Sequence, residues 1–404
     1  MRAGARVRAA ALAGAAGVAA LTFMPAGAAV AGPARAGQVG QAAGRDAGSQ
    51  PGQGRPDKAA RLIIGGPQLA SRGVVVNYPA GHPRRLPKVP ASAYVIANAT
   101  TGQVLAARDP HGEWAPASTL KVLTAIALIP RLDPDARVLT TRRAAMQEPN
   151  DVGILPGHRY KVADLFRALL LISANDAAMA LTQATGSFST GMALINAEAR
   201  HLQAYDVKAK LPNGLPARGQ VVSAYDEALI ARQALATPAF MKYDRTLSAR
   251  FKVKRKKRVT LVNQNSLLTH YRGALGGKIG WTVKSKATYI GMARRHGVTL
   301  IVTVLHCTPL LEVKAGERLL NWGFAMDGKV RPVGRLVAPL PATAARRVHQ
   351  TARPQPVSFG AESAARSTGE DAGLAIGAGI AAAAVFGLGT LAVRRRLAAA
   401  GRGH

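Results

Sequence analysis

Three short groups of polar residues in this 404-residue sequence have the types and spacing that nucleophilic catalysis requires. The first is Ser118-Thr119-Leu120-Lys121, at the start of a predicted helix. Side chains three residues apart lie on one helical face, with Cβ atoms about 5–6 Å apart. A lysine amine whose pKa is lowered by burial or a nearby cation can take the serine proton, and N–H groups at the helix N-terminus can stabilise an oxyanion. Taken alone, Ser118 fits a helix cap equally well.

The second and third groups add polar side chains and a glycine-rich strand. Ser173-Ala174-Asn175 separates two apolar helical segments, where its side chains either cap a helix or project into a cleft. The segment Gly276-Gly277-Lys278-Ile279-Gly280-Trp281-Thr282 has the pattern of a strand whose glycines allow a close approach of another backbone or a ligand. Lys278 is there either a positive charge for a substrate or an exposed strand lysine.

Hydrophobic periodicity predicts the elements that must position these groups. Strand patterns lie at both ends of the ordered region, and helical patterns lie between them. This arrangement predicts an α+β fold with an inserted helical subdomain. The predicted strands are 93–97, 103–107, 273–280, 287–293 and 299–305, and the predicted helices are 116–129, 162–172, 175–185, 190–202, 224–236 and 313–324.

The three groups follow one another in the order S-x-x-K, S-x-N and K-x-G, and this order makes a resemblance specific. The sequence resembles the low-molecular-mass penicillin-binding proteins, which are D-alanyl-D-alanine carboxypeptidases of the serine β-lactamase/transpeptidase superfamily. The resemblance implies a β-lactamase/transpeptidase-like fold, an antiparallel sheet flanked by helices. The flanking segments that agree are 92–105, 116–119, 175–178, Pro212-Asn213-Gly214-Leu215, Asn263-Gln264-Asn265 and Asn321-Trp322-Gly323-Phe324.

The resemblance also implies a role for each residue of the site. Ser118 would be the acylated nucleophile, Lys121 its general base, and Ser173 a proton relay to the leaving amine. Asn175 would hold the substrate peptide, and Lys278 its terminal carboxylate. The remaining substrate-binding residues would be Gly280, Trp281 and Thr282, with the N–H groups of Ser118 and Trp281 as the oxyanion hole.

The reaction implied is acylation by D-Ala-D-Ala stem peptides of peptidoglycan, release of D-Ala, and hydrolysis of the acyl-enzyme. β-Lactams would form stable covalent adducts. The resemblance implies no metal and no other cofactor.

Two departures from the family pattern concern recognition of the substrate carboxylate. Ile279 stands where the family usually has a hydroxyl residue, and the loss of a hydrogen bond to a charged group costs about 1.5–3 kcal/mol. Thr282 is the nearest replacement. Leu310-Leu311-Glu312 occupies the place where the family often has an arginine, with Lys314 as the nearest cation. The alternative function is therefore a non-catalytic or weakly active peptidoglycan-binding envelope protein that retains the fold.

Two other enzyme classes fit less well. The histidines lack the spacing of metal ligands, so a metallo-carboxypeptidase is not supported. A secreted β-lactamase would need a carboxylate motif for rapid deacylation, and the sequence offers none that is convincing.

Both ends of the chain indicate export and a membrane anchor. Arg2, Arg6 and Arg8 precede an apolar stretch that ends near Ala29-Val30-Ala31, which predicts a signal peptide over 1–31, with an uncleaved anchor as the alternative. Residues 374–393 are free of charge and precede Arg394-Arg395-Arg396. This pattern predicts a transmembrane helix, a basic cytoplasmic tail over 394–404 and an extracellular catalytic domain, with a loosely held helix as the alternative.

Composition sets the domain boundaries between these ends. Segments rich in Gly, Ala, Pro and Gln predict a disordered linker over 32–85 and a flexible stalk over 331–373, around a catalytic domain over 86–330. The hydrophobic content of 48% excludes a wholly disordered chain, and a single cysteine, Cys307, excludes a disulfide scaffold.

The net charge is +33, and part of it lies in one run, Lys252 to Arg258. The run is predicted at a hairpin tip, where it is either simply solvated or attracts anionic lipid headgroups or anionic polymers of the envelope. Nucleic acid is excluded as a partner because both ends of the chain indicate export.

Overall fold

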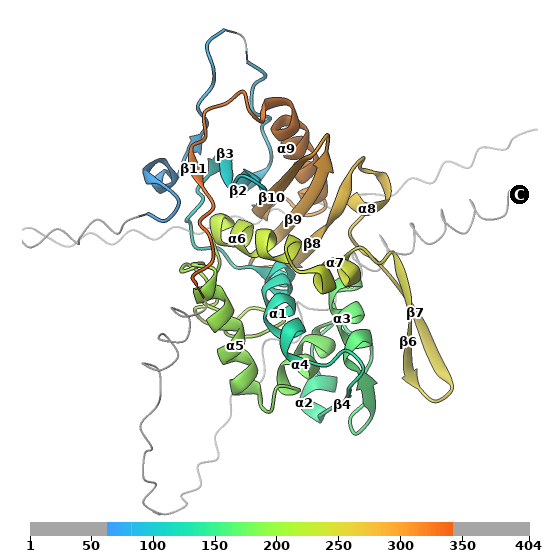
Figure 1. Cartoon of the computed structure of the whole chain (residues 1–404). Helices are drawn as coiled ribbons and strands as arrows, with labels where there is room; N and C mark the ends of the chain where they lie inside the picture. The colour runs from blue at the N-terminus through green and yellow to red at the C-terminus, as the bar shows by residue number, and fades with distance from the viewer. Residues whose placement is uncertain (1–62, 82, 342–404) are drawn as a thin grey trace, which may run out of the picture. The chain divides into compact units, whose positions relative to one another are not determined.

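An antiparallel sheet of seven strands is the central layer of the computed structural model, which describes residues 63–81 and 83–341 (Figure 1). The strand order is β1-β3-β2-β10-β9-β8, and β11 pairs with β3. β8 therefore ends the sheet. The strands are β1 (Val74–Val75), β2 (Ala91–Asn98), β3 (Gln103–Arg108), β8 (Ala274–Thr282), β9 (Lys286–Arg295), β10 (Val298–Cys307) and β11 (Gly334–Arg335).

Side chains that alternate along the strands build a separate hydrophobic core on each face of the sheet. In β2, Val95 and Ala97 belong to the larger core, whereas Tyr94 and Ile96 belong to the smaller one. Successive side chains of a strand point to opposite faces, so an apolar strand of this kind must be covered on both sides. Helix α9 (Glu312–Met326) covers the smaller core, and α6 (Ala224–Leu235) packs on the other face of β10 and β2.

The larger core extends from the sheet into a group of helices, which Figure 1 shows below the sheet. In this group α1 packs against α3, α4, α5 and α6. Its helices are α1 (Leu120–Leu128), α2 (Arg142–Ala145), α3 (Val162–Leu171), α4 (Asn175–Gln183), α5 (Phe188–His201) and α7 (Pro238–Asp244). The helices are accompanied by two hairpins, β4–β5 (Arg137–Leu139, Arg159–Lys161) and β6–β7 (Ser248–Lys254, Lys257–Val262). The remaining short helices are η1 (Pro67–Ala70), η2 (Ala117–Thr119), η3 (Ile129–Arg131) and α8 (Leu267–His270).

The α+β fold class, with an antiparallel sheet and helices between its early and late strands, is confirmed. Two predicted boundaries are wrong, because the fold extends beyond both. The predicted linker 32–85 includes β1, which pairs with β3, and Leu69, whose side chain is fully buried. The predicted stalk 331–373 includes β11, and Leu336 is also buried. The sequence pattern did not predict these segments as part of the folded domain, because their apolar residues follow neither a helix period nor a strand period.

The predicted signal peptide, transmembrane helix and cytoplasmic tail all lie outside the described residues. Within residues 63–81 and 83–341, none of the helices has both the length and the apolar character needed to cross a membrane.

Candidate active site

The turn that enters α1 carries the predicted nucleophile. Ser118 lies in η2, directly before α1, and Lys121 lies in the first turn of α1. The Lys121 Nζ and Ser118 Oγ atoms are 2.8 Å apart. Neither η2 nor α1 has a side-chain cap, so the alternative interpretation of Ser118 as a helix cap is wrong. The structure thus joins the hydroxyl and the amine as their spacing predicts.

Lys121 Nζ contacts three oxygen atoms, one of which is the hydroxyl oxygen of Ser118. Nζ donates to Asn213 O at 2.6 Å and to Asn175 Oδ1 at 2.8 Å. Both are acceptors, since Asn175 Nδ2 is used in a bond to Glu148 O at 2.8 Å, which fixes the orientation of the amide. An ammonium would donate to all three oxygens, whereas a neutral amine has two N–H donors and a lone pair that can accept the proton of Ser118.

Burial and a second cation favour this neutral state. The Lys121 side chain is completely buried, which lowers its pKa well below the usual value of a lysine. The positive charge of Lys278 lowers the pKa of Lys121 further, while Asp176 opposes the shift. An amine with a lowered pKa is available as a general base near neutral pH.

Ser173 lies in a backbone conformation that is rare for a residue with a side chain. Its φ is +63°, between the end of α3 and the start of α4. Its Oγ is buried and has no hydrogen-bond partner among the described residues. The N-cap of α4 is Ala174 and has no side-chain cap bond, so a capping role for Ser173 is wrong. A strained residue with an unsatisfied buried hydroxyl points to a role in binding or proton transfer.

Asn175 links the base to the loop of residues 146–155. Its backbone N–H donates to Asn150 O at 2.7 Å, in addition to the side-chain bond to Glu148 O. The next residue, Asp176, is fully buried and accepts from the N–H groups of Val152, Gly153 and Ile154. These bonds hold the loop against the start of α4, so Asn175 presents its Oδ1 to Lys121 from a fixed position.

The third predicted group, on β8, lies directly against Ser118. A Cβ atom added at Gly280 would be 2.6 Å from Ser118 N and 3.0 Å from Thr119 N. Only glycine therefore allows this approach of strand and helix. Trp281 follows Gly280 on this edge strand, and its N–H stays a predicted member of the oxyanion hole.

Lys278 is buried, with 2% of its surface exposed, so its interpretation as an exposed strand lysine is wrong. Its Nζ donates to Ile279 O at 2.7 Å. Burial lowers the pKa of Lys278 to about 7, and the nearby charge of Asp244 partly opposes this shift. Lys278 thus supplies a titratable cation whose field reaches Lys121.

Asp244, at the end of α7, was not found from the sequence. The side chain is fully buried, and Oδ2 accepts from Gly277 N at 2.7 Å. A Cβ at Gly276, whose φ is +146°, would be 2.0 Å from that oxygen, so glycine makes room for the carboxylate. Burial raises the pKa of Asp244 to about 7. No local motif marks this residue, because it reaches the site through the packing of α7 on β8.

A second residue that sequence reasoning missed supports the nucleophile turn from α6. The fully buried Glu227 is hydrogen-bonded to Thr119 Oγ1, and Thr119 Oγ1 also bonds Pro116 O at 2.6 Å. Burial raises the pKa of Glu227 to about 8. The protonated carboxyl can donate to Thr119, which leaves the threonine proton for Pro116. Glu227 therefore acts on Ser118 through the turn that carries it.

Ile279, which departs from the family pattern, and Thr282, its expected replacement, are placed differently. Ile279 belongs to the smaller core, opposite Tyr289 on β9, and faces away from Lys278 by strand alternation. Thr282 shares the face of Lys278, but its Oγ1 is 2.7 Å from Ser285 Oγ in the β8–β9 turn. The Thr282 hydroxyl is thus already held by a neighbour.

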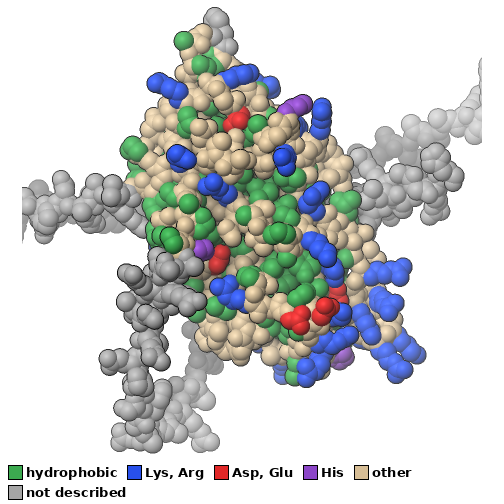
Figure 2. Space-filling model, in the orientation of Figure 1, with side chains coloured by type: hydrophobic (Ala, Val, Ile, Leu, Met, Phe, Trp, Pro, Cys, Tyr) green, Lys and Arg blue, Asp and Glu red, His purple; other side chains and the backbone are tan. Residues whose placement is uncertain are grey.

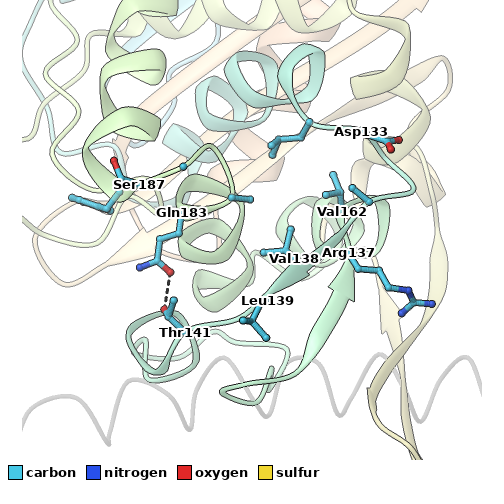
Figure 3. Close-up of a pocket in the computed structure, with 13 residues that line it drawn as sticks. Asp133, Arg137, Val138, Leu139, Thr141, Val162, Gln183 and Ser187 are labelled. Atoms are coloured by element: carbon cyan, nitrogen blue, oxygen red, sulfur yellow. Dashed lines mark hydrogen bonds between the residues drawn. The ribbon is translucent and has the colours of Figure 1, made fainter.

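Two other features of the described residues lie apart from this chemistry. An open cavity of about 450 Å³ is lined by β4, the end of α4 and the start of α5, and none of the predicted site residues lines it (Figure 3). His111, Asp206 and Asp226 place ligand atoms close together, but both ring nitrogens of His111 are occupied, by Asp206 Oδ2 at 2.7 Å and Ile64 O at 3.0 Å. These bonds describe a structural network.

The site as a whole is that of a serine acyltransferase with a lysine base. The site contains the Ser118 hydroxyl with an adjacent lysine amine, a second hydroxyl without a hydrogen-bond partner, a buried cation and an edge strand.

Comparison with known proteins agrees with this class. The family model described as D-alanyl-D-alanine carboxypeptidase, peptidase family S11, matches residues 81–308, and the chain belongs to this family. DacB2, a D-alanyl-D-alanine carboxypeptidase of Mycobacterium tuberculosis, is 35% identical over 252 residues, which are 60% of this chain and 85% of that protein. DacF of Bacillus subtilis is 27% identical and is covered over 62% of its length.

Solved structures give the same result. A D-alanyl-D-alanine carboxypeptidase from M. tuberculosis aligns with a TM-score of 0.60 and 34% identity, over 65% of this chain and 99% of the other. The Streptomyces K15 DD-transpeptidase aligns with a TM-score of 0.57 and 25% identity, over 60% of this chain and all of the other.

Proposed function

We propose that the protein is a serine-type D-Ala-D-Ala carboxypeptidase that removes the terminal D-Ala of peptidoglycan stem peptides through an acyl-enzyme. The observation that carries the proposal is the 2.8 Å contact between Ser118 Oγ and Nζ of Lys121, a lysine whose burial lowers its pKa. Membership of the carboxypeptidase family supports the choice of substrate.

The reaction begins when Lys121 takes the proton of Ser118 and Oγ attacks the carbonyl carbon of the last peptide bond. The oxyanion forms beside the N–H groups of Ser118 and Trp281. The proton reaches the leaving amine of D-Ala through the Ser173 hydroxyl, which is free to accept and donate. Water then attacks the ester carbonyl while Lys121 takes its proton, the bond between the carbonyl carbon and Ser118 Oγ breaks, and Lys121 passes this proton to Oγ. Lys278 attracts the terminal carboxylate of the substrate.

The alternative function, binding without turnover, is not favoured. A protein that only bound stem peptides would have no need of a buried lysine with a lowered pKa next to a serine hydroxyl. A β-lactam would acylate Ser118 by the same attack, with the opened ring still attached to the carbonyl. Membership of the family supports this covalent binding.

Measuring D-Ala release from a soluble stem pentapeptide tests the proposal. The wild-type protein should release one D-Ala per peptide, and Ser118→Ala should release none above background. Failure of the folded wild-type protein to release D-Ala would overturn the assignment.

We also propose that the catalytic domain lies outside the cell, exported by residues 1–31 and anchored by residues 374–393. The support is the apolar character of both segments and the arginines next to each of them. Cell-surface proteolysis tests the topology. Protease added to intact cells should digest the domain, and protection of the domain in intact but not lysed cells would contradict it.

A further inference from the structure

The β6–β7 hairpin carries a concentration of positive charge that the catalytic site does not use. Seven of the nine residues from Arg250 to Arg258 are Lys or Arg, and all seven are exposed. The hairpin projects from the helices in Figure 1, and Lys and Arg side chains gather on the same side of the molecule in Figure 2. We call this set the basic hairpin: Arg250, Lys252, Lys254, Arg255, Lys256, Lys257 and Arg258.

One face of the hairpin is fixed to the protein, so the cations of β6 face outward together. Phe251 and Val253 are buried on the inner face. Phe251 stacks on Tyr160 with ring centroids 5.5 Å apart, and Tyr160 Oη donates to Val253 O at 2.7 Å. Because alternate residues of a strand share a face, Arg250, Lys252 and Lys254 form one outward row.

The cations repel one another across the two strands. Lys252 is directly opposite Arg258, and Lys254 is directly opposite Lys257. Like charges in cross-strand pairs destabilise a hairpin. None of the salt bridges among residues 63–81 and 83–341 involves residues 250–258. The protein itself does not neutralise this charge, so an external anion would relieve the repulsion.

The shape of the row favours a linear polymer over a single small anion. Outward side chains along β6 are about 7 Å apart, and those of β7 form a second row about 5 Å away. An anionic membrane fits less well, since elements that bind at a lipid surface commonly insert apolar side chains. The large exposed apolar residues nearest the basic hairpin, Leu247 and Val262, lie at its base.

The base of the hairpin is attached to the catalytic site. Gln264 N, just after β7, donates to Leu171 O at 2.9 Å, and Leu171 is the last residue of α3, two positions before Ser173. Asn263 Nδ2 bonds Asp244 O at 2.8 Å. A polymer on the hairpin would therefore be bound to an element whose base contacts α3 and α7, which carry or precede residues of the site.

We propose that the basic hairpin binds a linear polyanion, and so holds the enzyme on polyanion-bearing cell wall. The binding itself is independent of the carboxypeptidase activity. The consequence for catalysis, a higher local concentration of wall-borne stem peptides, rests on the proposed function.

Binding of fluorescent long-chain inorganic polyphosphate to the full-length protein in detergent tests the proposal. The test variant is Lys252→Gln/Lys254→Gln/Arg258→Gln, and the control variant, Arg318→Gln/Lys329→Gln/Arg331→Gln, removes three exposed cations elsewhere. In 0.1 M salt we expect at least ~10-fold weaker binding for the test variant and less than ~2-fold for the control. The slope of log affinity against log salt should fall by about 2, as expected for three lost contacts to a single-stranded polyanion.

Three results would overturn the proposal. The first is that the wild-type protein does not bind polyphosphate at low salt, and the second is that both variants lose affinity for polyphosphate equally. The third is hairpin-dependent binding to phosphatidylglycerol vesicles without binding to polyphosphate. Thermal unfolding separates lost contacts from lost folding, because relief of the cross-strand repulsion should leave the test variant at least as stable as the wild type. D-Ala release from a small soluble peptide should be unchanged in the test variant. Failure of the wild-type protein in that assay would contradict only the proposed function.

Discussion

Replacement of Asp244 by Asn tests the role of a residue that has no motif. Asn keeps a carbonyl oxygen that can accept from Gly277 N, but it removes the negative charge beside Lys278. That charge raises the pKa of Lys278, which is about 7 in the wild-type protein. We therefore expect the variant to hold Lys278 in its neutral form at a lower pH than the wild type does.

The magnitude depends on pH in a specific way. A loss of one pKa unit, about 1.4 kcal/mol, would lower the pKa of Lys278 to about 6. The protonated fraction of Lys278 would then fall ~5-fold at pH 7 and ~10-fold at pH 8. At pH 5 the wild type and the variant should have the same protonated fraction of Lys278, because this lysine is protonated in both. Asp244, whose pKa burial raises to about 7, is then neutral in the wild type.

The assay is the second-order rate constant of acylation by a fluorescent penicillin from pH 5 to pH 9. The alkaline limb of the Asp244→Asn profile should move toward acid by about one pH unit. Asp226→Asn is a matched control, since Asp226 is also buried with a raised pKa but does not act on Lys278. An unchanged profile for Asp244→Asn, or an equal shift in both variants, would refute the argument.

Four further predictions concern single residues. Glu227→Gln should flatten the dependence of stability on pH. The pKa of Glu227 is about 8 in the folded protein and 4.5 is its usual value, so wild-type stability falls as pH rises from 4.5 to 8. Plots of melting temperature against pH that run parallel for the two proteins would contradict this. Gly280→Ala should abolish acylation, because the added methyl collides with Ser118 N; a near-normal acylation rate would show that the approach is not required. Ser173→Ala should slow D-Ala release by ~100-fold or more while the protein stays folded, as expected for loss of a proton relay, and full release would exclude that role. Ile279→Thr should leave kcat/KM for the peptide within ~2-fold, because residue 279 faces the smaller core and away from Lys278, and a ~10-fold rise would show that the missing hydroxyl limits carboxylate binding.

The sequence was sufficient to predict the parts of the site whose chemistry depends on local spacing. Ser118 and Lys121 are one helical turn apart, so their contact follows from helix geometry alone. The apolar strands and helices were equally predictable, since each has a clear period. The convergence of β8 on Ser118 was implied only by resemblance to a family.

The sequence was insufficient where a role depends on tertiary packing. Asp244 and Glu227 have raised pKa values because other elements bury them, and no nearby residue indicates this. The left-handed conformation of Ser173 likewise depends on how α3 and α4 pack. The segments around Leu69 and Leu336 were predicted as linker and stalk because their short apolar groups, separated by Gly and Pro, give no periodic signal.

Intact-mass spectrometry of the full-length protein with saturating penicillin tests the central claim, that Ser118 is the acylated nucleophile. The wild-type protein should gain the mass of one intact penicillin, located on the peptide that contains Ser118, and Ser118→Ala should gain nothing. A folded wild-type protein without an adduct, or an adduct that persists in Ser118→Ala, would contradict the account.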